Sequence, residues 1–490
     1  MKPTLNEARR IADENLYKVI PLSCEIYSDV VTPVELLRRL KKVSANTFLL
    51  ESVEDKEHWG RYTFLGYKPT MEISCQNKIL TVKKDCAESF ETDDPSAFIK
   101  KVLDENRSPK FEDFPPFTGG LMGYFSFDYV RYAEPSLAKS KVCDDDFKDL
   151  DLMLFDKIIA FDHYKQKIIL IVNIRLDNLE LEYEKGLGEL SRLKELVLNG
   201  SPVERTPAKF TSEFKALFSL DEYCEMVQKA KRYIKEGDIF QVVLSNRLEV
   251  GFEGSLLDAY RVLRTTNPSP YMFYFGSENV EVAGASPETL VKLKDGKLYT
   301  FPLAGTRPRG ETKDLDSAFE KDLLADEKEL AEHNMLVDLG RNDLGKISKF
   351  GSVAVEKYME ILRFSHVMHI GSTVSSQILD VKDGRDAIAA VLPAGTLSGA
   401  PKIRAIQIID ELENCNRGLY GGAIGYLDFT GNMDTCIAIR IAYKKNGKAF
   451  VRAGAGIVAD SDPKSEYTEC ENKMKSVLNA LKASEGGIDR

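Results

Sequence analysis

The sequence predicts an α+β fold, in which β-sheets and α-helices form separate layers. Up to residue 201, short strand patterns follow one another and are separated by Gly, Pro and Asn turn signals. Beyond that point strand patterns and helical patterns come in blocks, and no unit repeats at a fixed period. Grouped strands and grouped helices are typical of α+β layers, whereas regular alternation would predict βαβ units.

Residues 1–201 are predicted to form an N-terminal α+β domain. Strands are expected at residues 47–51, 61–65, 71–75, 78–82, 156–162 and 167–174, and a charged helix at residues 179–198. Gly200, Ser201 and Pro202 end this helix. Residues 202–220 combine Pro and polar residues with little periodicity, so we interpret them as a linker.

Residues 221–490 are predicted to form a C-terminal domain, against which some N-terminal elements can also pack. Helices are expected at residues 221–236, 317–339, 384–391 and 400–412. Strands are expected at residues 239–245, 281–286, 423–428, 435–443 and 449–455.

Composition and charge narrow the class of protein. The chain has 490 residues, of which 43% are hydrophobic and 29% charged, so a folded protein of two to three domains is expected. The formal net charge of −10 argues against a nucleic-acid partner held by a basic surface. We also expect no secretory signal and no membrane span, because no apolar run reaches roughly 18 residues. The eight cysteines form no C-x-x-C pair, which favours a reducing, cytoplasmic location.

Two pairs of glutamates are the first candidate site. Glu329 and Glu332, and likewise Glu466 and Glu469, are spaced i,i+3 on expected helices, so each pair faces one way. Facing pairs of hard oxygen ligands would suit Mg²⁺ and leave room for an anionic substrate. The alternative is a solvated charged face, since such pairs are common on helices. Lys473, four residues after Glu469, fits either interpretation.

Two turn-rich segments are candidates for binding anions or hydroxyl groups. Residues 301–310 (FPLAGTRPRG) offer backbone amides and the Thr306 hydroxyl, although an ordinary surface turn has the same composition. Residues 393–402 (PAGTLSGAPK) open onto an expected helix, whose free N–H groups favour an anion. The spacing G-x-x-x-x-G-K-[ST] is absent, so the second segment does not predict an NTPase.

A third glycine-rich segment, residues 454–459 (GAGIVA), fits the pattern G-x-G-x-x-A. We expect a turn at residues 460–463, where a dinucleotide-binding fold would continue into a helix. The segment is therefore interpreted as a glycine-lined cradle for a carboxylate.

His366 and His369 form an i,i+3 pair on a helix or strand. A zinc site is not expected without a third ligand. One of the two is a candidate general base, and a structural, hydrogen-bonded histidine is the alternative.

Taken together, these segments resemble the chorismate-utilising enzymes, and within them the component I group of anthranilate synthases. The matching motifs are ASPETL (285–290), PLAGTRPRG (302–310), ELAEHNMLVDLGRNDLG (329–345), VMH (367–369), PAGTLSGAPK (393–402), CIAIR (436–440) and AGAGIVADSDPKSEYTECENK (453–473). The resemblance implies layered antiparallel β-sheets with helices, the anthranilate-synthase-type chorismate-binding fold. It also assigns 1–201 as a regulatory domain and 221–490 as the catalytic domain.

The resemblance implies a role for most of the candidate residues. Glu332 and Glu469 would hold Mg²⁺, which binds the ring carboxylate of chorismate, with Glu329 and Glu466 behind them. Glu288 would be the general acid for the leaving 4-hydroxyl, and His369 would assist the loss of pyruvate. The residues implied to grip the substrate are Gly305, Thr306, Thr396, Tyr420, Arg440, Gly454, Ala455, Gly456 and Lys473.

Two positions separate the relatives by chemistry. Isochorismate- and salicylate-forming members place a lysine, as base for water, where this chain has Gln241. The p-aminobenzoate-forming members carry a nucleophilic lysine where this chain has Ala304, so no covalent intermediate forms at that position. The expected reaction is therefore direct addition of ammonia to C2 of chorismate, followed by elimination of pyruvate to give anthranilate.

The resemblance further implies partners. No Gly-x-Cys-x-Gly nucleophile of a glutamine amidotransferase is present, so ammonia is expected from a separate component II in a hetero-oligomer, as in a heterotetramer. L-Tryptophan, the pathway end product, is the expected feedback inhibitor. Its contacts are implied at Ser52 and at Pro270, Tyr271 and Met272. From spacing alone, the alternative to a tryptophan site is structural: Ser52 ends a strand and Met272 packs in a core.

Two other functions remain open from the sequence. One is a chorismate enzyme that stops at 2-amino-2-deoxyisochorismate, since the first step would use the same site. The other is a catalytically silent, amino-acid-binding regulatory protein on the same scaffold, which the complete set of candidate acids disfavours.

Overall fold

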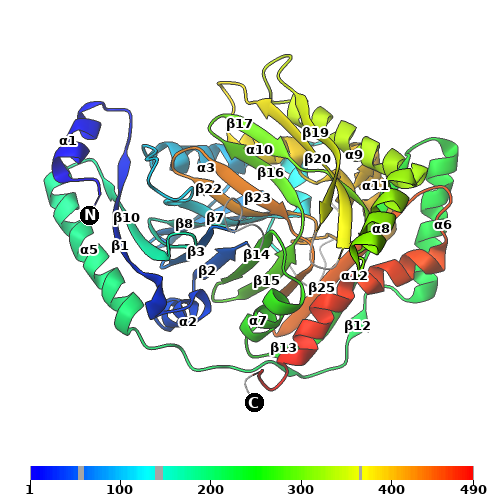
Figure 1. The fold of residues 1–490 in the computed structure, drawn as a ribbon, viewed down its shortest axis with the longest axis horizontal. Helices are drawn as coiled ribbons and strands as arrows, with labels where there is room; N and C mark the ends of the chain where they lie inside the picture. The colour runs from blue at the N-terminus through cyan, green and yellow to red at the C-terminus, as the bar shows by residue number, and fades with distance from the viewer. Residues whose placement is uncertain (1, 53–59, 138–146, 364–366, 489–490) are drawn as a thin grey trace.

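The computed structural model describes residues 2–52, 60–137, 147–363 and 367–488 and has the predicted α+β fold (Figure 1). The described strands form two large sheets, and all pairings between named strands are antiparallel. In the described residues the first sheet has 13 strands and the second has 12.

The first sheet has the order β1 (Val19–Tyr27), β10 (Lys167–Arg175), β9 (Lys157–Asp162), β3 (Tyr62–Tyr67), β2 (Thr47–Glu51), β14 (Tyr271–Gly276), β15 (Val280–Ser286), β24 (Ile441–Lys445), β25 (Lys448–Ile457), β13 (Gln241–Glu253) and β11 (Lys209–Phe210). Two short strands, β12 (Lys215–Ala216) and β21 (Gly399–Ala400), also pair with β13.

The second sheet has the order β18 (Leu303–Pro308), β20 (Val367–Gln377), β17 (Lys297–Thr300), β16 (Thr289–Lys294), β23 (Met433–Ile437), β22 (Ala423–Asp428), β7 (Gly120–Phe125), β8 (Leu150–Phe155), β4 (Met71–Gln76), β5 (Ile79–Lys83) and β6 (Ala87–Glu91). Strand β19 (Ala354–Arg363) pairs with β20.

The described α-helices are α1 (Leu5–Asp13), α2 (Pro33–Val43), α3 (Pro95–Asp104), α4 (Val130–Ala133), α5 (Leu179–Asn199), α6 (Leu220–Glu236), α7 (Leu257–Thr266), α8 (Lys313–Ala325), α9 (Glu327–Gly345), α10 (Gly384–Val391), α11 (Lys402–Glu413) and α12 (Pro463–Ser484). Short 3₁₀ helices are η1 (Ser28–Val30), η2 (Phe127–Tyr129) and η3 (Gly395–Leu397). Among the described segments, none of these helices is long and apolar enough to cross a membrane.

The two sheets pack face to face through an aromatic core. Phe48 of the first sheet meets Phe155 of the second, with ring centroids 4.8 Å apart in an edge-on arrangement, and Phe275 stacks against Tyr124 at 6.2 Å. Helices α1, α2, α5, α7 and α12 bury their apolar sides against the first sheet. Helices α3, α9 and α10 do the same against the second sheet. The result is a four-layer helix, sheet, sheet, helix arrangement.

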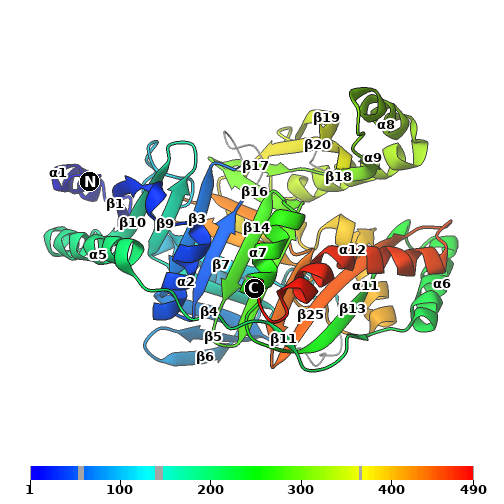
Figure 2. The same cartoon turned by 60° about the horizontal axis from the view of Figure 1, so that its bottom comes forward.

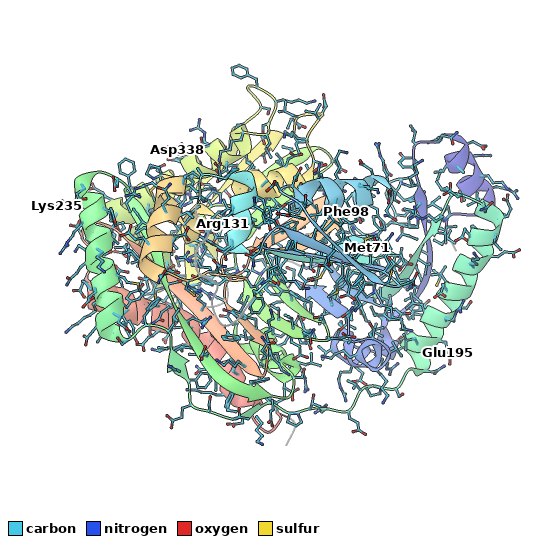
Figure 3. The ribbon with its side chains drawn as sticks, turned by 180° about the vertical axis from the view of Figure 1, so that it is seen from behind. Met71, Phe98, Arg131, Glu195, Lys235 and Asp338 are labelled. Atoms are coloured by element: carbon cyan, nitrogen blue, oxygen red, sulfur yellow. The ribbon has the colours of Figure 1, made fainter. Side chains whose placement is uncertain are left out.

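Helices also close the two ends of the molecule. Helix α5 lies at one side and α6 at the opposite side in Figure 1, and Figure 3 labels Glu195 and Lys235 on these two helices from behind. Helix α6 begins with a capping box, in which Ser219 and Glu222 satisfy each other's backbone amides. It ends at Gly237, whose φ of +85° terminates the helix.

Both sheets run across the segment predicted to be a linker. Strand β2 pairs with β14 in the first sheet, with Glu51 opposite Met272, and β7 pairs with β22 in the second sheet. Within residues 202–220, β11 and β12 form edge pairs with β13. The division into 1–201, 202–220 and 221–490 stays a prediction, and neither part holds a complete sheet.

Two predicted elements differ from the structure for local reasons. The helix predicted at 317–339 is interrupted at Asp326, whose side chain accepts hydrogen bonds from the Lys328 and Glu329 amides and starts α9 as a new helix. Figure 2 shows α8 and α9 beside β18 at one edge of the second sheet. The strand predicted at 435–443 is split into β23 and β24, because Arg440 adopts a left-handed φ of +50° between them.

Candidate active site

The predicted catalytic residues gather where the turn between β15 and β16 approaches η3, helices α9 and α12, the edge strand β18 and its neighbour β20. Glu288 lies in that turn, where its carbonyl accepts from the Ile437 amide and its own amide donates to Ser286. Thr396 of η3 donates a hydrogen bond of 3.0 Å to the Glu288 carboxyl. These contacts fix the Glu288 side chain at the end of the second sheet.

Glu288 is the candidate acid. Burial raises the pKa of its carboxyl to about 7, and the Thr396 hydrogen bond and the positive charge of Lys473 oppose this rise without cancelling it. A carboxyl with this pKa is partly protonated at neutral pH and can give up a proton there. The predicted role of Glu288 fits its surroundings.

His369 lies on β20, opposite the turn that carries Gly305. Its Nδ1 is 2.8 Å from the Gly305 carbonyl oxygen and 3.1 Å from the Thr306 hydroxyl. Because a carbonyl only accepts, Nδ1 carries the proton and the lone pair of the neutral ring is on Nε2. Burial lowers the pKa of His369, and so does the positive charge of Arg440. The hydrogen bond to Gly305 raises this pKa but does not cancel the lowering. His369 is thus held as a neutral base. His366, its predicted neighbour, lies outside the described residues.

The two glutamate pairs lie on separate helices that face each other. Burial and the neighbouring carboxylate of Glu329 raise the pKa of Glu332, and the charge of Glu469 on the other helix contributes. Burial likewise raises the pKa of Glu466. Glu329 also approaches Gly305 of strand β18, since a Cβ on Gly305 would lie 3.4 Å from the Glu329 Oε2 atom.

The fit of these carboxylates to a metal ion follows from their charges. Across the described ranges, no group of three or more His, Cys, Asp or Glu residues is placed to hold a metal by itself. The four carboxylates therefore do not form a closed cage. Glu332 and Glu469 are two hard oxygen donors that repel each other, and a divalent cation between them would relieve that repulsion. The remaining coordination positions would fall to water or to a substrate carboxylate.

Lys473 connects the acidic helix to the glycine-rich strand. Its Nζ is 2.7 Å from the Glu469 carboxylate and donates to the Gly454 carbonyl at 3.0 Å. Atoms of neighbouring residues approach the glycines on β25 too closely to leave room for a Cβ atom. A Cβ on Gly454 would lie 2.8 Å from the Leu244 carbonyl, and one on Gly456 would lie 2.5 Å from the side-chain amide of Gln241.

Arg440 is a half-buried cation that has no acidic partner among the described residues. Burial alone lowers the pKa of its guanidinium, and in the part of the chain that the structure describes no carboxylate pairs with it. Its Nη1 makes a long, 3.4 Å hydrogen bond to Asn267. The buried Tyr420 hydroxyl lies 3.0 Å from the position of a Cβ on Gly454. A cation in this condition favours an anionic ligand.

Two features of the structure argue against the dinucleotide alternative. We expected a turn at residues 460–463, and the structure has one at residues 459–460, within the segment 458–462 that separates β25 from the start of α12 at Pro463. In addition, strand β25 is antiparallel to both of its neighbours, β13 and β24. A Rossmann site needs a parallel βαβ unit, which this arrangement does not supply.

The residues predicted to bind tryptophan come together at the β2 and β14 pair. Glu51 lies opposite Met272, and Ser52 follows it directly. Ser52 Oγ is buried and has no hydrogen-bond partner among the described residues. Met272 is buried, and the Tyr271 hydroxyl bonds to Thr289 and Asp434. The strand pairing thus joins Ser52 to Pro270, Tyr271 and Met272 across the predicted linker.

Sequence reasoning missed a fully buried charge network beside the site. Glu413 accepts from Arg417, from Arg452 and from the amide and hydroxyl of Ser245. Arg417 also donates to the Leu397 carbonyl at 2.6 Å, directly after Thr396. The charge of Arg452 within the apolar strand sequence AFVRAGAG was the available signal.

Comparisons with known proteins show the family to which the chain belongs. A family model described as "chorismate binding enzyme" matches residues 46–479. The chain belongs to this family, so the prediction that it is an enzyme of the chorismate-utilising class is confirmed.

Within the family, the similar curated proteins are named anthranilate synthase component 1. That of Acetivibrio thermocellus is 44% identical over 98% of both chains, and that of Aquifex aeolicus is 43% identical over 98% of both chains. The crystal structure of anthranilate synthase component I from Streptococcus pneumoniae is 37% identical, with a TM-score of 0.75 over 92% of this chain and 98% of that one. The menaquinone-specific isochorismate synthase of Escherichia coli shares the fold at 18% identity, with a TM-score of 0.71 over 97% of this chain and 98% of that one.

Replacing the acid of the buried network tests its contribution to stability. Glu413→Gln should lower the free energy of unfolding by about 3 kcal/mol or more, because two buried guanidinium groups lose their counter-charge. The matched control is Glu411→Gln on the same helix, whose carboxylate is exposed and should change stability by less than about 0.5 kcal/mol. Chemical unfolding of both variants gives the comparison, and equal midpoints would contradict the expected role.

Proposed function

We propose that this chain catalyses the conversion of chorismate to anthranilate with ammonia, the first committed step of L-tryptophan biosynthesis. The observation that carries the proposal is the half-buried Glu288, with a pKa of about 7 and a hydrogen bond from Thr396. The full-length similarity to proteins named anthranilate synthase component 1 supports the same reaction.

The first step joins nitrogen to the ring. The C2–N bond forms, both ring double bonds move by one position, and the C4–O bond breaks with its electron pair on oxygen. Glu288 gives that oxygen its proton, so the group leaves as water. Arg440, Tyr420 and the glycine-lined strand would hold the carboxylates of the substrate during this step.

The second step restores aromaticity. The proton on C2 is lost and the C3–O bond breaks, so that the enolpyruvyl group leaves and becomes pyruvate on protonation. His369 suits the removal of a proton because its Nδ1–H is held by Gly305 and its lowered pKa keeps the ring neutral. Anthranilate is the product.

Mg²⁺ is the proposed cofactor, and Glu332 and Glu469 would hold it. When bound, such an ion neutralises the ring carboxylate and orients it. The repulsion between the two carboxylates supports this assignment, with Glu329 and Glu466 behind them.

The residues at two positions favour ammonia over water and over a covalent route. Gln241 carries an amide, which is no base for water, and it faces Gly456 at the substrate strand. Ala304 has no nucleophile. Ammonia is therefore proposed to add directly, supplied in the cell by a glutamine amidotransferase subunit, component II, in a cytoplasmic hetero-oligomer such as a heterotetramer.

The purified chain should form anthranilate from chorismate, Mg²⁺ and ammonium salt, and should not use glutamine without its partner. Anthranilate fluorescence measures the product, and EDTA should remove the activity until Mg²⁺ is restored. Glu469→Ala should abolish turnover at ordinary Mg²⁺ concentrations, whereas Glu471→Ala, an exposed residue on the same helix, should not. Accumulation of 2-amino-2-deoxyisochorismate, or no turnover at all, would instead favour one of the two other functions.

The pKa of Glu288 predicts a pH dependence. The protonated acid predominates below a pH of about 7, so the rate per unit of free ammonia should fall about tenfold for each pH unit above it. Initial rates between pH 6 and 9, divided by the free NH₃ concentration, give the profile. The Glu288→Gln variant should lose most of its activity, and its remaining rate should no longer fall with pH. If the normalised rate of the unsubstituted enzyme does not change with pH, Glu288 is not the acid.

Feedback inhibition by L-tryptophan is proposed at the β2 and β14 pair. The Ser52 hydroxyl, which has no hydrogen-bond partner in the part of the chain that the structure describes, offers a polar contact, and the buried Met272 offers an apolar one. The two residues lie on opposite sides of the predicted linker. Pro270 and Tyr271 complete the set, and Tyr271 reaches Thr289, next to Glu288. A ligand here inhibits only if it binds an inactive arrangement better than the active one.

Ser52→Phe should fill this site and relieve inhibition by tryptophan, because the larger ring takes the space of the ligand. Turnover with ammonia should change little, since the candidate catalytic residues lie elsewhere. Activity is measured against tryptophan up to the millimolar range. Unchanged sensitivity of Ser52→Phe, or an insensitive unsubstituted enzyme, would remove the regulatory site.

A further inference from the structure

A small cavity lies behind Glu288. The space in it that water can occupy is about 40 Å³. Its walls come from α9, from the β16 and β17 strands and from the segment that leads into η3. The polar wall residues are Glu288, Thr289, Thr300, Asp343 and Thr396.

The cavity is distinct from the predicted substrate pocket. Of the residues predicted to bind substrate or metal or to act in catalysis, only Glu288 and Thr396 line it. Gly305, Arg440 and the glycines of β25 lie outside its walls. Glu288 and Thr396 are therefore the residues that the predicted site and the cavity share.

The cavity is suited to water. A site of this size holds a few water molecules when it offers them several polar partners. Glu288 and Asp343, which line the cavity, carry carboxyls that can bond to water. The hydroxyls of Thr289 and Thr300 already bond to Tyr271 and to the Leu290 carbonyl, and each keeps a lone pair that can accept a further hydrogen bond. The other wall residues, among them Leu336, Leu339 and Val391, are apolar or glycine, so water inside would find its side-chain partners among these polar groups.

Asp343 connects the cavity to charged groups that reach the surface. Its carboxylate is buried, 2.7 Å from the Lys402 ammonium and 3.2 Å from that of Lys346. Lys402 is buried and also donates to the Val391 carbonyl, and burial lowers its pKa. Lys346 is half exposed. A hydrogen-bonded route thus leads from solvent through Lys346 and Asp343 to the cavity.

The proposed first step creates a need for such a route. Glu288 loses one proton to the departing 4-hydroxyl, and the new C2–NH₃⁺ group carries one proton in excess of the neutral amine. The substrate covers the front of Glu288 at that moment. Glu288 must regain one proton before the next turnover, and the amine must release one.

We propose that the cavity holds a chain of water molecules that returns the proton to Glu288 from the Asp343, Lys402 and Lys346 cluster. This inference rests on the proposed function, and Asp343 acts in it through water on Glu288. No redox change occurs: one proton enters at Lys346 or Asp343, passes along the waters and ends on the Glu288 carboxylate. The amine proton leaves separately to solvent.

The test fills the cavity from α9. A Cβ on Gly340 would lie 3.1 Å from Thr300 Cγ2 inside the cavity wall, whereas a Cβ on Gly345 of the same helix meets nothing within 4 Å. Gly340→Ala should lower kcat about fivefold, a fraction of the total effect of acid catalysis, and leave the KM for chorismate unchanged. The solvent deuterium isotope effect on kcat should rise about twofold. Gly345→Ala should change none of these.

A second measurement does not depend on turnover. A high-resolution crystal structure of the unsubstituted protein should show ordered water between the Glu288 and Asp343 carboxyls, and that of Gly340→Ala should show fewer. A dry cavity in the unsubstituted protein, or an unchanged kcat and isotope effect in a folded Gly340→Ala variant, would overturn the proton route. Failure of the unsubstituted chain to form anthranilate would instead overturn the proposed function, so the two failures are distinguishable.

Discussion

The structure around the site depends on one buried carboxylate, that of Glu413. It holds two guanidinium groups that are almost inaccessible to solvent, and it binds the backbone of β13 at Ser245. Arg417 also donates a hydrogen bond to the carbonyl of Leu397, the residue after Thr396. Arg452 lies on β25, two residues before Gly454. A buried pair of this kind is costly to desolvate and is tolerated only when its hydrogen bonds are satisfied. The segments that carry Thr396 and the β25 glycines are thus fixed to one another through Glu413.

The second constraint is that both sheets continue across residues 202–220. Strand β2, which ends next to Ser52, lies beside β14, with Glu51 opposite Met272. Strand β14 pairs with β15, which ends at Ser286, and the Ser286 hydroxyl receives the Glu288 amide. The regulation proposed above would therefore need no movement of separate domains. A shift within one sheet can reach Glu288 through two neighbouring strands.

Much of the fold and most of the candidate site could be predicted from the sequence, for physical reasons that differ. Strands such as 47–51 and 423–428 were predicted with the observed limits, because turn residues mark both of their ends. The break at Asp326 was missed because the helical pattern continues through a residue that is also a strong cap. The left-handed backbone at Arg440 was missed because no glycine marks it. The Glu413 network joins residues far apart in the chain, so no local pattern reveals it.

The charges of the site explain why these features occur together. Arg440 is half-buried without an acidic partner among the described residues, while Glu332 and Glu469 repel each other across two helices. Each condition destabilises the folded protein by itself, and each is relieved by a ligand of the opposite charge. A substrate that carries carboxylates would meet the arginine directly and would meet the glutamates through a cation. Lys473 offsets part of the charge at Glu469, and a cation together with an anionic ligand would offset the rest.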